Sequence, residues 1–105
     1  MSEEGEEQNR EKNKSYTLPE ANLWEHAGKL AIVDDKPIML DYWTDSFDKK
    51  ALIGVRDNGE KLLVKNAEEY TSPIAKIYKV EGAYIICTEN SIYLTSSDIP
   101  TKKIS

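Results

Sequence analysis

The tripeptide Asp57-Asn58-Gly59 lies between two short runs of β-favouring residues, 51–56 and 60–66. Asparagine and glycine tolerate the positive φ that a tight hairpin turn requires, so this stretch predicts an antiparallel strand pair. Similar runs recur along most of the chain, at 29–35, 37–43, 51–56, 60–66, 74–80, 83–88 and 91–94. Their regular spacing predicts a mainly β fold of about seven short strands, built as a small meander barrel or a curled antiparallel sheet.

A single helix is expected before the strands. Thr17 and Glu20 have the spacing of a capping box, and Pro19 between them suits the first helical turn. Gly28 is a common type of residue just past a helix end. The sequence therefore predicts one N-terminal helix over residues 18–27.

The two ends of the chain differ from its middle in composition. Residues 1–15 are acidic and contain no apolar side chain after Met1, so we expect a disordered acidic tail. Residues 16–97 are expected to form a single β-rich domain that includes the helix. Residues 98–105 are expected to run over its surface as a C-terminal tail.

Charge and hydropathy exclude several classes of protein. The net charge of −5 excludes a uniformly basic nucleic-acid binder, although the C-terminal half is mildly basic. No apolar run approaches the roughly 18 residues that cross a bilayer, and no signal peptide is visible. The chain has one cysteine and so cannot form an internal disulfide. We therefore expect a soluble, cytoplasmic protein without a membrane partner.

Strand alternation gives a candidate core. The residues expected to be buried are Leu30, Ile32, Ile38, Leu40, Leu52, Leu62, Val64, Ile77, Ile85, Cys87, Ile92 and Leu94, with Trp24 packed over them. Cys87 is placed among them because free cysteine is often buried, and because a strand interior by itself supplies nothing that would lower the pKa of its thiol.

Few residues suggest catalysis. A dyad of Cys87 with the single histidine, His26, would require the fold to bring two distant elements together, and these two residues cannot form a zinc site alone. Aspartates are frequent around the first predicted hairpin, at positions 34, 35, 41, 45 and 48. They could hold a divalent cation, but turns also favour aspartate. We expect no catalytic residue, no cofactor, no metal and no small-molecule substrate.

Two sets of residues are candidates for binding. Tyr42 and Trp43 end the run 37–43 next to an acidic loop, and in a strand one of them must leave the core side and could anchor a protein partner. The second set combines cations with aromatic rings and consists of Lys61, Lys65, Lys76, Tyr78 and Tyr93. A shared face of these residues would suit a protein partner or single-stranded nucleic acid, although a merely solvated face has the same composition.

Three functions follow from these patterns. The first is a non-catalytic binding module, an accessory subunit of a larger protein assembly, by analogy with small subunits of replication, transcription or translation machinery. The second is direct binding of single-stranded nucleic acid by the lysine and tyrosine set. The third is a small enzyme or metal protein that uses the aspartates or Cys87.

Overall fold

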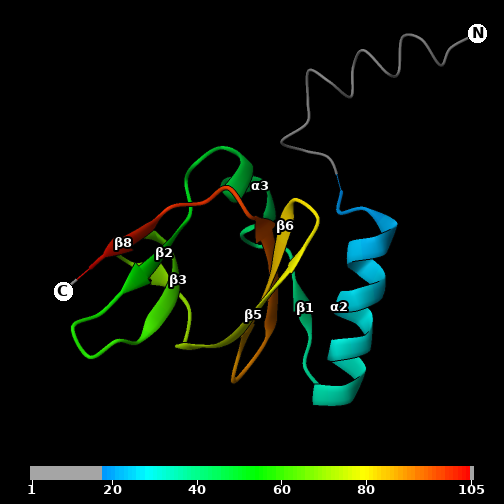
Figure 1. Ribbon diagram of the computed structural model, residues 1–105. Helices are drawn as coiled ribbons and strands as arrows, with labels where there is room; N and C mark the ends of the chain where they lie inside the picture. Colours follow the sequence, from blue (N-terminus) through cyan, green and yellow to red (C-terminus); the bar gives the residue numbers. More distant parts are fainter. Residues whose placement is uncertain (1–17, 105) are drawn as a thin grey trace, which may run out of the picture.

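Three layers make up the computed structural model, which describes residues 18–104 (Figure 1). Helix α2 (Ala21–Asp34) covers one face of a four-stranded sheet, sheet A, and a second four-stranded sheet, sheet B, covers the other face. The short helix α3 (Trp43–Phe47) lies at one end of the layers. The central strands of sheet A are therefore covered on both faces.

Each sheet combines antiparallel and parallel pairs. Sheet A has the order β1 (Ile38–Met39), β7 (Ile92–Ser96), β6 (Ala83–Thr88) and β5 (Ile74–Val80). Sheet B has the order β4 (Glu69–Tyr70), β3 (Lys61–Asn66), β2 (Leu52–Val55) and β8 (Thr101–Lys103). The parallel pairs are β1 with β7 and β2 with β8, and all other pairs are antiparallel.

The mainly β class with an N-terminal helix is confirmed, but the finer prediction needs correction. The described residues form eight strands in two mixed sheets that do not close into a barrel. The meander prediction assumed that consecutive strands always pair. Instead, the chain leaves sheet A after β1, builds β2 to β4 in sheet B, returns for β5 to β7 and leaves again for β8.

The hairpin predicted at Asp57-Asn58-Gly59 is present between β2 and β3. Val55 pairs with Lys61, and the Arg56 N–H donates to the Glu60 carbonyl at 2.8 Å. Gly59 has a φ of +92°, which a residue with a side chain rarely adopts. The hairpin that the local turn signal predicted is therefore confirmed.

Helix α2 is longer than predicted and passes through Gly28. It begins at Ala21 after Glu20 and includes residues 29–34, which the sequence pattern assigned to a strand. Leu23, Ala27, Leu30 and Ala31 have helical spacing and pack on sheet A, which explains the continuation. Thr17, the predicted N-cap, lies outside the described residues.

The helix ends at Asp35, which has a left-handed φ of 55° and donates its N–H to the Ala31 carbonyl. Because residues 29–34 are helical, Ile32 points away from sheet A and is 83% exposed. Its predicted burial is therefore wrong.

The predicted strand 37–43 is also shorter than expected. Only Ile38 and Met39 are in a strand, and the chain then turns into α3, which occupies part of a segment predicted as loop. Leu40 is exposed, contrary to its predicted burial, because it lies in this turn and not in a strand.

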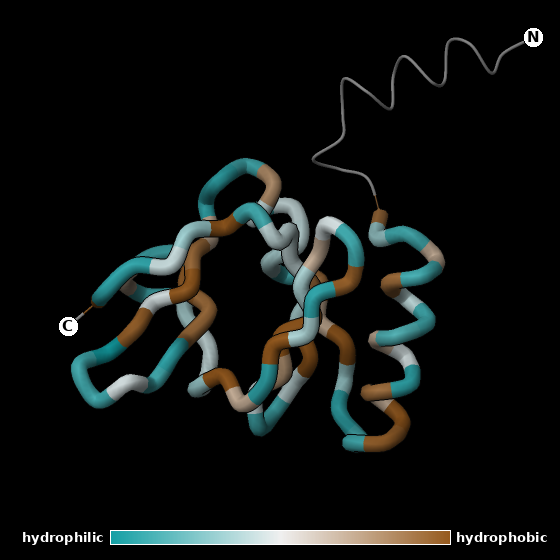
Figure 2. The backbone as a smooth tube through the Cα atoms, viewed as in Figure 1, coloured by the Kyte–Doolittle hydropathy of each residue, from teal (hydrophilic) through white to brown (hydrophobic). Residues whose placement is uncertain are grey.

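Two hydrophobic clusters fill the spaces between the layers. Figure 2 shows hydrophobic stretches of the backbone in both sheets and in α2. Strand β6 supplies both: Ala83, Ile85 and Cys87 face α2, and Ile86 faces sheet B with Tyr84. Predicted burial is confirmed for Leu62, Ile85, Cys87, Ile92 and Leu94. Partial burial is found for Trp24, Leu30, Ile38, Leu52, Val64 and Ile77.

The C-terminal segment contributes more than a surface tail. Residues 101–103 form β8, and the Ile53 N–H donates to the Pro100 carbonyl at 2.9 Å. Ile99 is buried in the cluster between the sheets. The acidic tail predicted over residues 1–15 lies outside the described residues.

Candidate functional site

Tyr42 and Trp43, the predicted protein-binding anchors, are both buried, with 6% and 7% of their surface exposed. The prediction that one of them faces solvent is wrong. It assumed a strand, in which neighbouring side chains point to opposite faces. Here the chain enters α3 instead, and Tyr42 packs in the cluster between the sheets while Trp43 packs in the cluster under α2.

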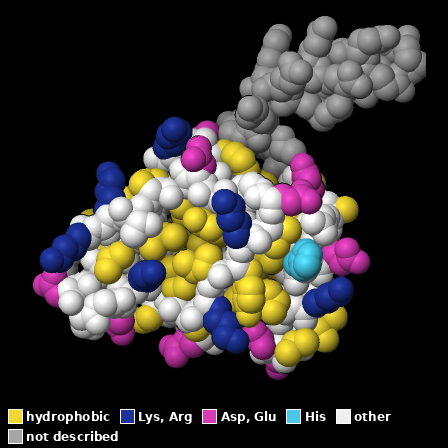
Figure 3. All heavy atoms as spheres, viewed as in Figure 1, with side chains coloured by type: hydrophobic (Ala, Val, Ile, Leu, Met, Phe, Trp, Pro, Cys, Tyr) yellow, Lys and Arg dark blue, Asp and Glu magenta, His cyan; other side chains and the backbone are white. Residues whose placement is uncertain are grey.

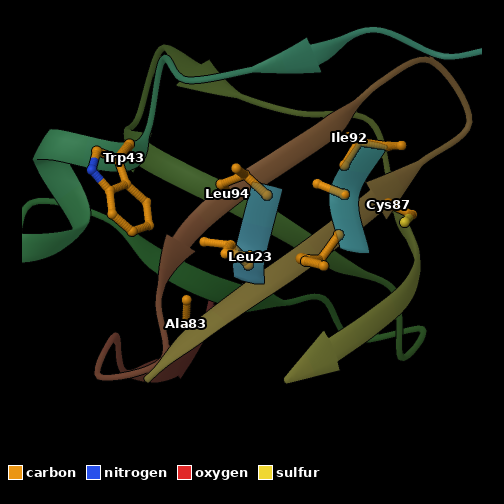
Figure 4. Close-up of a cluster of buried hydrophobic side chains, with 8 residues drawn as sticks. Leu23, Trp43, Ala83, Cys87, Ile92 and Leu94 are labelled. Atoms are coloured by element: carbon orange, nitrogen blue, oxygen red, sulfur yellow. The ribbon is translucent and has the colours of Figure 1, made fainter. Parts of the chain in front are cut away.

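Trp43 nevertheless reaches the surface, because it lines an open pocket of about 350 Å³. This pocket, which we call the α2/α3 pocket, lies between the start of α2, helix α3 and the turn from β5 to β6. Its lining consists of Leu18, Glu20, Leu23, Trp43, Phe47, Val80, Glu81, Gly82 and Ala83. Figure 4 shows Trp43 reaching from α3 toward the buried cluster, with Leu23 of α2 and Ala83 of β6 on the same side.

The pocket has an apolar interior and an acidic rim. Leu18 and Phe47 are 68% and 37% exposed, so part of the apolar lining is open to solvent. The Phe47 ring meets the Trp43 ring edge to face at 4.7 Å. Among the described residues of the lining, Glu20 and Glu81 are the only charged ones, and both carry a negative charge. The pocket therefore suits an apolar group with a neighbouring positive charge.

Hydrogen bonds fix both sides of the pocket. The Ser46 hydroxyl donates to the Trp43 carbonyl at 2.6 Å and accepts from the Ser96 N–H at 2.8 Å, which ties α3 to β7. On the other side, the Asn22 amide donates to the Glu81 carboxylate at 3.1 Å, which links α2 to the β5–β6 turn. The two walls are thus held by contacts between segments that are distant in sequence.

The lysine and tyrosine set does not form one patch. Lys61 and Lys65 lie on β3, on the face of sheet B that carries Leu63 and packs against sheet A. Tyr93 packs in the cluster between the sheets. Only Lys76 and Tyr78, both exposed on β5, share a face at the surface. On the face seen in Figure 3, basic side chains are scattered singly.

The Lys65 side chain contacts Asp45 and Tyr42. Its ammonium lies 3.2 Å from the Asp45 carboxylate and 4.9 Å from the centre of the Tyr42 ring. A lysine held in this way has less freedom to follow a phosphate backbone. The five residues therefore do not share the single face on which the prediction of single-stranded nucleic-acid binding was based.

Tyr42 sits in an environment that opposes ionisation. Its ring meets the Tyr93 ring edge to face at 5.5 Å. Burial, together with the neighbouring Tyr93 and Glu69 side chains, raises the pKa of Tyr42 from 10.0 to about 12. The hydroxyl is therefore neutral in the folded protein at a pH where an unfolded chain has begun to lose this proton.

This shift predicts an alkaline loss of stability that depends on Tyr42. The raised pKa favours folding fully below pH 10, and this contribution of roughly 2 kcal/mol is lost as the pH rises from 10 to 12. Tyr42→Phe should flatten the fall in the free energy of unfolding over this range, measured by urea titration. Tyr70→Phe, at an exposed tyrosine, is the matched control and should keep the wild-type slope. An unchanged slope in Tyr42→Phe would contradict the assignment.

The groups considered for catalysis are not arranged as a site. Cys87 is buried as predicted, and burial raises the pKa of its thiol, which disfavours the reactive thiolate. His26 is exposed on α2, where Figure 3 shows it at the surface. Among residues 18–104, no three His, Cys, Asp or Glu side chains gather to hold a metal ion, and Asp45 pairs with Lys65.

In comparisons with known proteins, no protein-family model, no curated protein and no solved structure matches the chain. In the described part of the chain, no helix has the length and apolar character needed to span a membrane.

Sequence reasoning missed most of the α2/α3 pocket. Leu18, Phe47, Val80 and Glu81 come from four segments, of which two were predicted as loop or turn. One signal was available: Phe47 is the single phenylalanine of the chain and stands in an otherwise polar segment. Single apolar residues are common on protein surfaces, however, so this signal alone did not indicate a pocket.

Proposed function

We propose that the protein is a non-catalytic docking module that uses the α2/α3 pocket to hold a bulky apolar side chain of a partner protein. In this role it would serve as an accessory subunit of a larger assembly. The observation that carries the proposal is the pocket itself. It is an open apolar hollow lined by two aromatic rings, with two carboxylates at its rim and no basic residue among the described residues of its lining.

The charge at the rim indicates the kind of segment that fits. Glu20 and Glu81 attract lysine or arginine and repel aspartate or glutamate. A partner segment should therefore carry a phenylalanine, tryptophan or leucine next to a basic residue. Its apolar side chain alone would contribute about 1.5–3 kcal/mol, which corresponds to weak binding unless other contacts add to it.

The two tryptophans allow a direct test. Trp43 lines the pocket, whereas Trp24 lies partly buried on α2 outside the lining. The probe is an amidated peptide, Lys-Lys-Phe-Lys-Lys, added to the full-length protein and followed by the NMR signals of the two indole N–H groups. We expect the Trp43 signal to move in proportion to occupancy and the Trp24 signal, identified with Trp24→Phe, to stay in place.

Three comparisons make the test specific. The double variant Leu18→Ala/Phe47→Ala removes exposed apolar lining and should weaken binding at least fivefold, from about 1 kcal/mol or more of lost apolar contact. Ile32→Ala, at an exposed aliphatic residue of the same helix, should leave binding unchanged. The peptide Glu-Glu-Phe-Glu-Glu should bind less than the basic peptide. The proposal fails if neither indole signal responds or if Ile32→Ala weakens binding as much as the double variant.

A further inference from the structure

Strand β5 forms a long open edge of sheet A. It spans seven residues, Ile74–Val80, and in the described part of the chain its only strand partner is β6. The other edge strands are short, since β1 and β4 have two residues each and β8 has three. A long unpaired edge presents backbone N–H and C=O groups that a further strand can bond.

Two exposed lysines lie on this edge strand. Lys76 and Lys79 are exposed, and neither forms an ion pair with another described residue. They point to opposite faces of sheet A, because Lys76 is paired with Cys87, which faces α2, and Lys79 is paired with Tyr84, which faces sheet B. The two residues between them, Ile77 and Tyr78, are well suited to a β-strand.

The charged residues of β5 are both cations, Lys76 and Lys79. Residues directly opposite each other on paired strands point to the same face of a sheet and interact. An acidic residue opposite either lysine would form a favourable charge pair, and a basic residue there would be repelled. The edge therefore favours a partner strand with acidic residues at these two positions.

We propose that the β5 edge receives an extended segment of a partner protein with the pattern acid–apolar–apolar–acid. In either strand direction, the residues opposite Lys76 and Lys79 are three positions apart, so aspartate or glutamate belongs at the first and fourth positions. β-branched or aromatic residues belong between them, opposite Ile77 and Tyr78. Backbone hydrogen bonds hold the segment, and the two charge pairs select it. This edge adjoins the α2/α3 pocket at Val80, but the proposal does not require that pocket.

The test uses the acetylated and amidated peptide Thr-Glu-Val-Val-Glu-Thr with the full-length protein at low salt. Binding should shift the backbone amide signals of β5 and slow the hydrogen exchange of its outward N–H groups. Lys76→Glu/Lys79→Glu should lower the affinity for this peptide about fivefold to tenfold, because two cross-strand charge pairs become repulsive. The same variant should gain affinity for Thr-Lys-Val-Val-Lys-Thr by a similar factor.

Further comparisons distinguish the addition of a strand to β5 from nonspecific attraction of the acidic peptide to the lysines of the protein. Lys49→Glu/Lys102→Glu changes the net charge equally at exposed residues outside β5 and should leave the affinity nearly unchanged. A peptide that is N-methylated on the valine whose N–H faces β5 should lose binding, whereas methylation of the other valine should be tolerated. Binding should survive Leu18→Ala/Phe47→Ala, which reports on the pocket alone.

Three results would overturn the proposal. These are an absence of shifts in β5, equal binding of both methylated peptides, and equal losses in the two double lysine variants.

Discussion

Replacing Ile86 by alanine is expected to lower the free energy of unfolding by about 3 kcal/mol, the largest effect of any single change proposed for this protein. Ile86 has no exposed surface and lies on β6, the strand between β5 and β7. Its side chain fills the space between the two sheets with Ile53 and Leu63. Both sheets contribute to the lining of this site, so a cavity there cannot be closed by the movement of a single side chain.

Urea denaturation followed by circular dichroism measures this loss, provided that the slope with denaturant stays the same in the variant. Ile32→Ala is the matched control, because it removes the same atoms from a residue that is 83% exposed. It should change the free energy of unfolding by less than about 0.5 kcal/mol. Similar losses in both variants would show that the space between the sheets is not the main core.

Replacing Ser46 by alanine is expected to cost about 2 kcal/mol, although it removes a single oxygen atom. Ser46 is buried and its hydroxyl serves as donor to the Trp43 carbonyl and as acceptor from the Ser96 N–H. Without the hydroxyl, the N–H of Ser96 is left in the interior with no partner that can replace it. The cost of that unsatisfied group exceeds the net value of an ordinary hydrogen bond.

The same variant should also disturb the α2/α3 pocket, because Ser46 holds α3 in place beside β7. We expect broadened or shifted signals of the Trp43 indole and weaker binding of the basic peptide, with the Trp24 signal unchanged. Ser97→Ala, at a partly exposed serine of the next loop, serves as the comparison and should cost less than about 0.5 kcal/mol. If Ser46→Ala is as stable as Ser97→Ala, the bridge between α3 and β7 contributes nothing to stability.

Local patterns in the sequence predicted the parts of the fold that local interactions decide. The turn at Asp57-Asn58-Gly59 predicted the β2–β3 hairpin, and alternation predicted the burial of Ile85, Cys87, Ile92 and Leu94. Alternation missed Ile86, because this strand is buried on both faces and not on one. In these segments, the turn residues and the alternation of apolar residues predict the same strands. Where such signals agree, the elements can be read before any tertiary contact is known.

The helix was misjudged where two signals conflicted. Residues 29–35 contain Ile32 and Val33, which favour strands, and Gly28 before them favours a helix end. The spacing of Leu23, Ala27 and Leu30 continues the helix, and packing on sheet A outweighs the weak local preference. As a result, Ile32 and Val33 are on the exposed side of α2.

The candidate pocket could not be predicted because its walls come from distant segments. Ser46 and Ser96 are fifty positions apart and meet only when α3 rests against β7. Asn22 and Glu81 are fifty-nine positions apart. The aromatic pair Tyr42-Trp43 was noticed from sequence, but the direction of its side chains depends on the turn into α3, which has no clear local signal.

The order in which the chain visits its two sheets has a consequence for how the protein folds and unfolds. Ile38 of sheet A pairs with Ile92, and Ile53 of sheet B pairs with Thr101. Each sheet thus contains a pair of strands that are far apart in the sequence, and the two chain segments that these pairs enclose overlap. Along the chain, β2 to β4 of sheet B lie between β1 and β5 of sheet A, and β5 to β7 of sheet A lie between β4 and β8 of sheet B. We therefore expect the domain to melt in a single cooperative transition, and to fold slowly for its size because its final pairings join such widely separated residues.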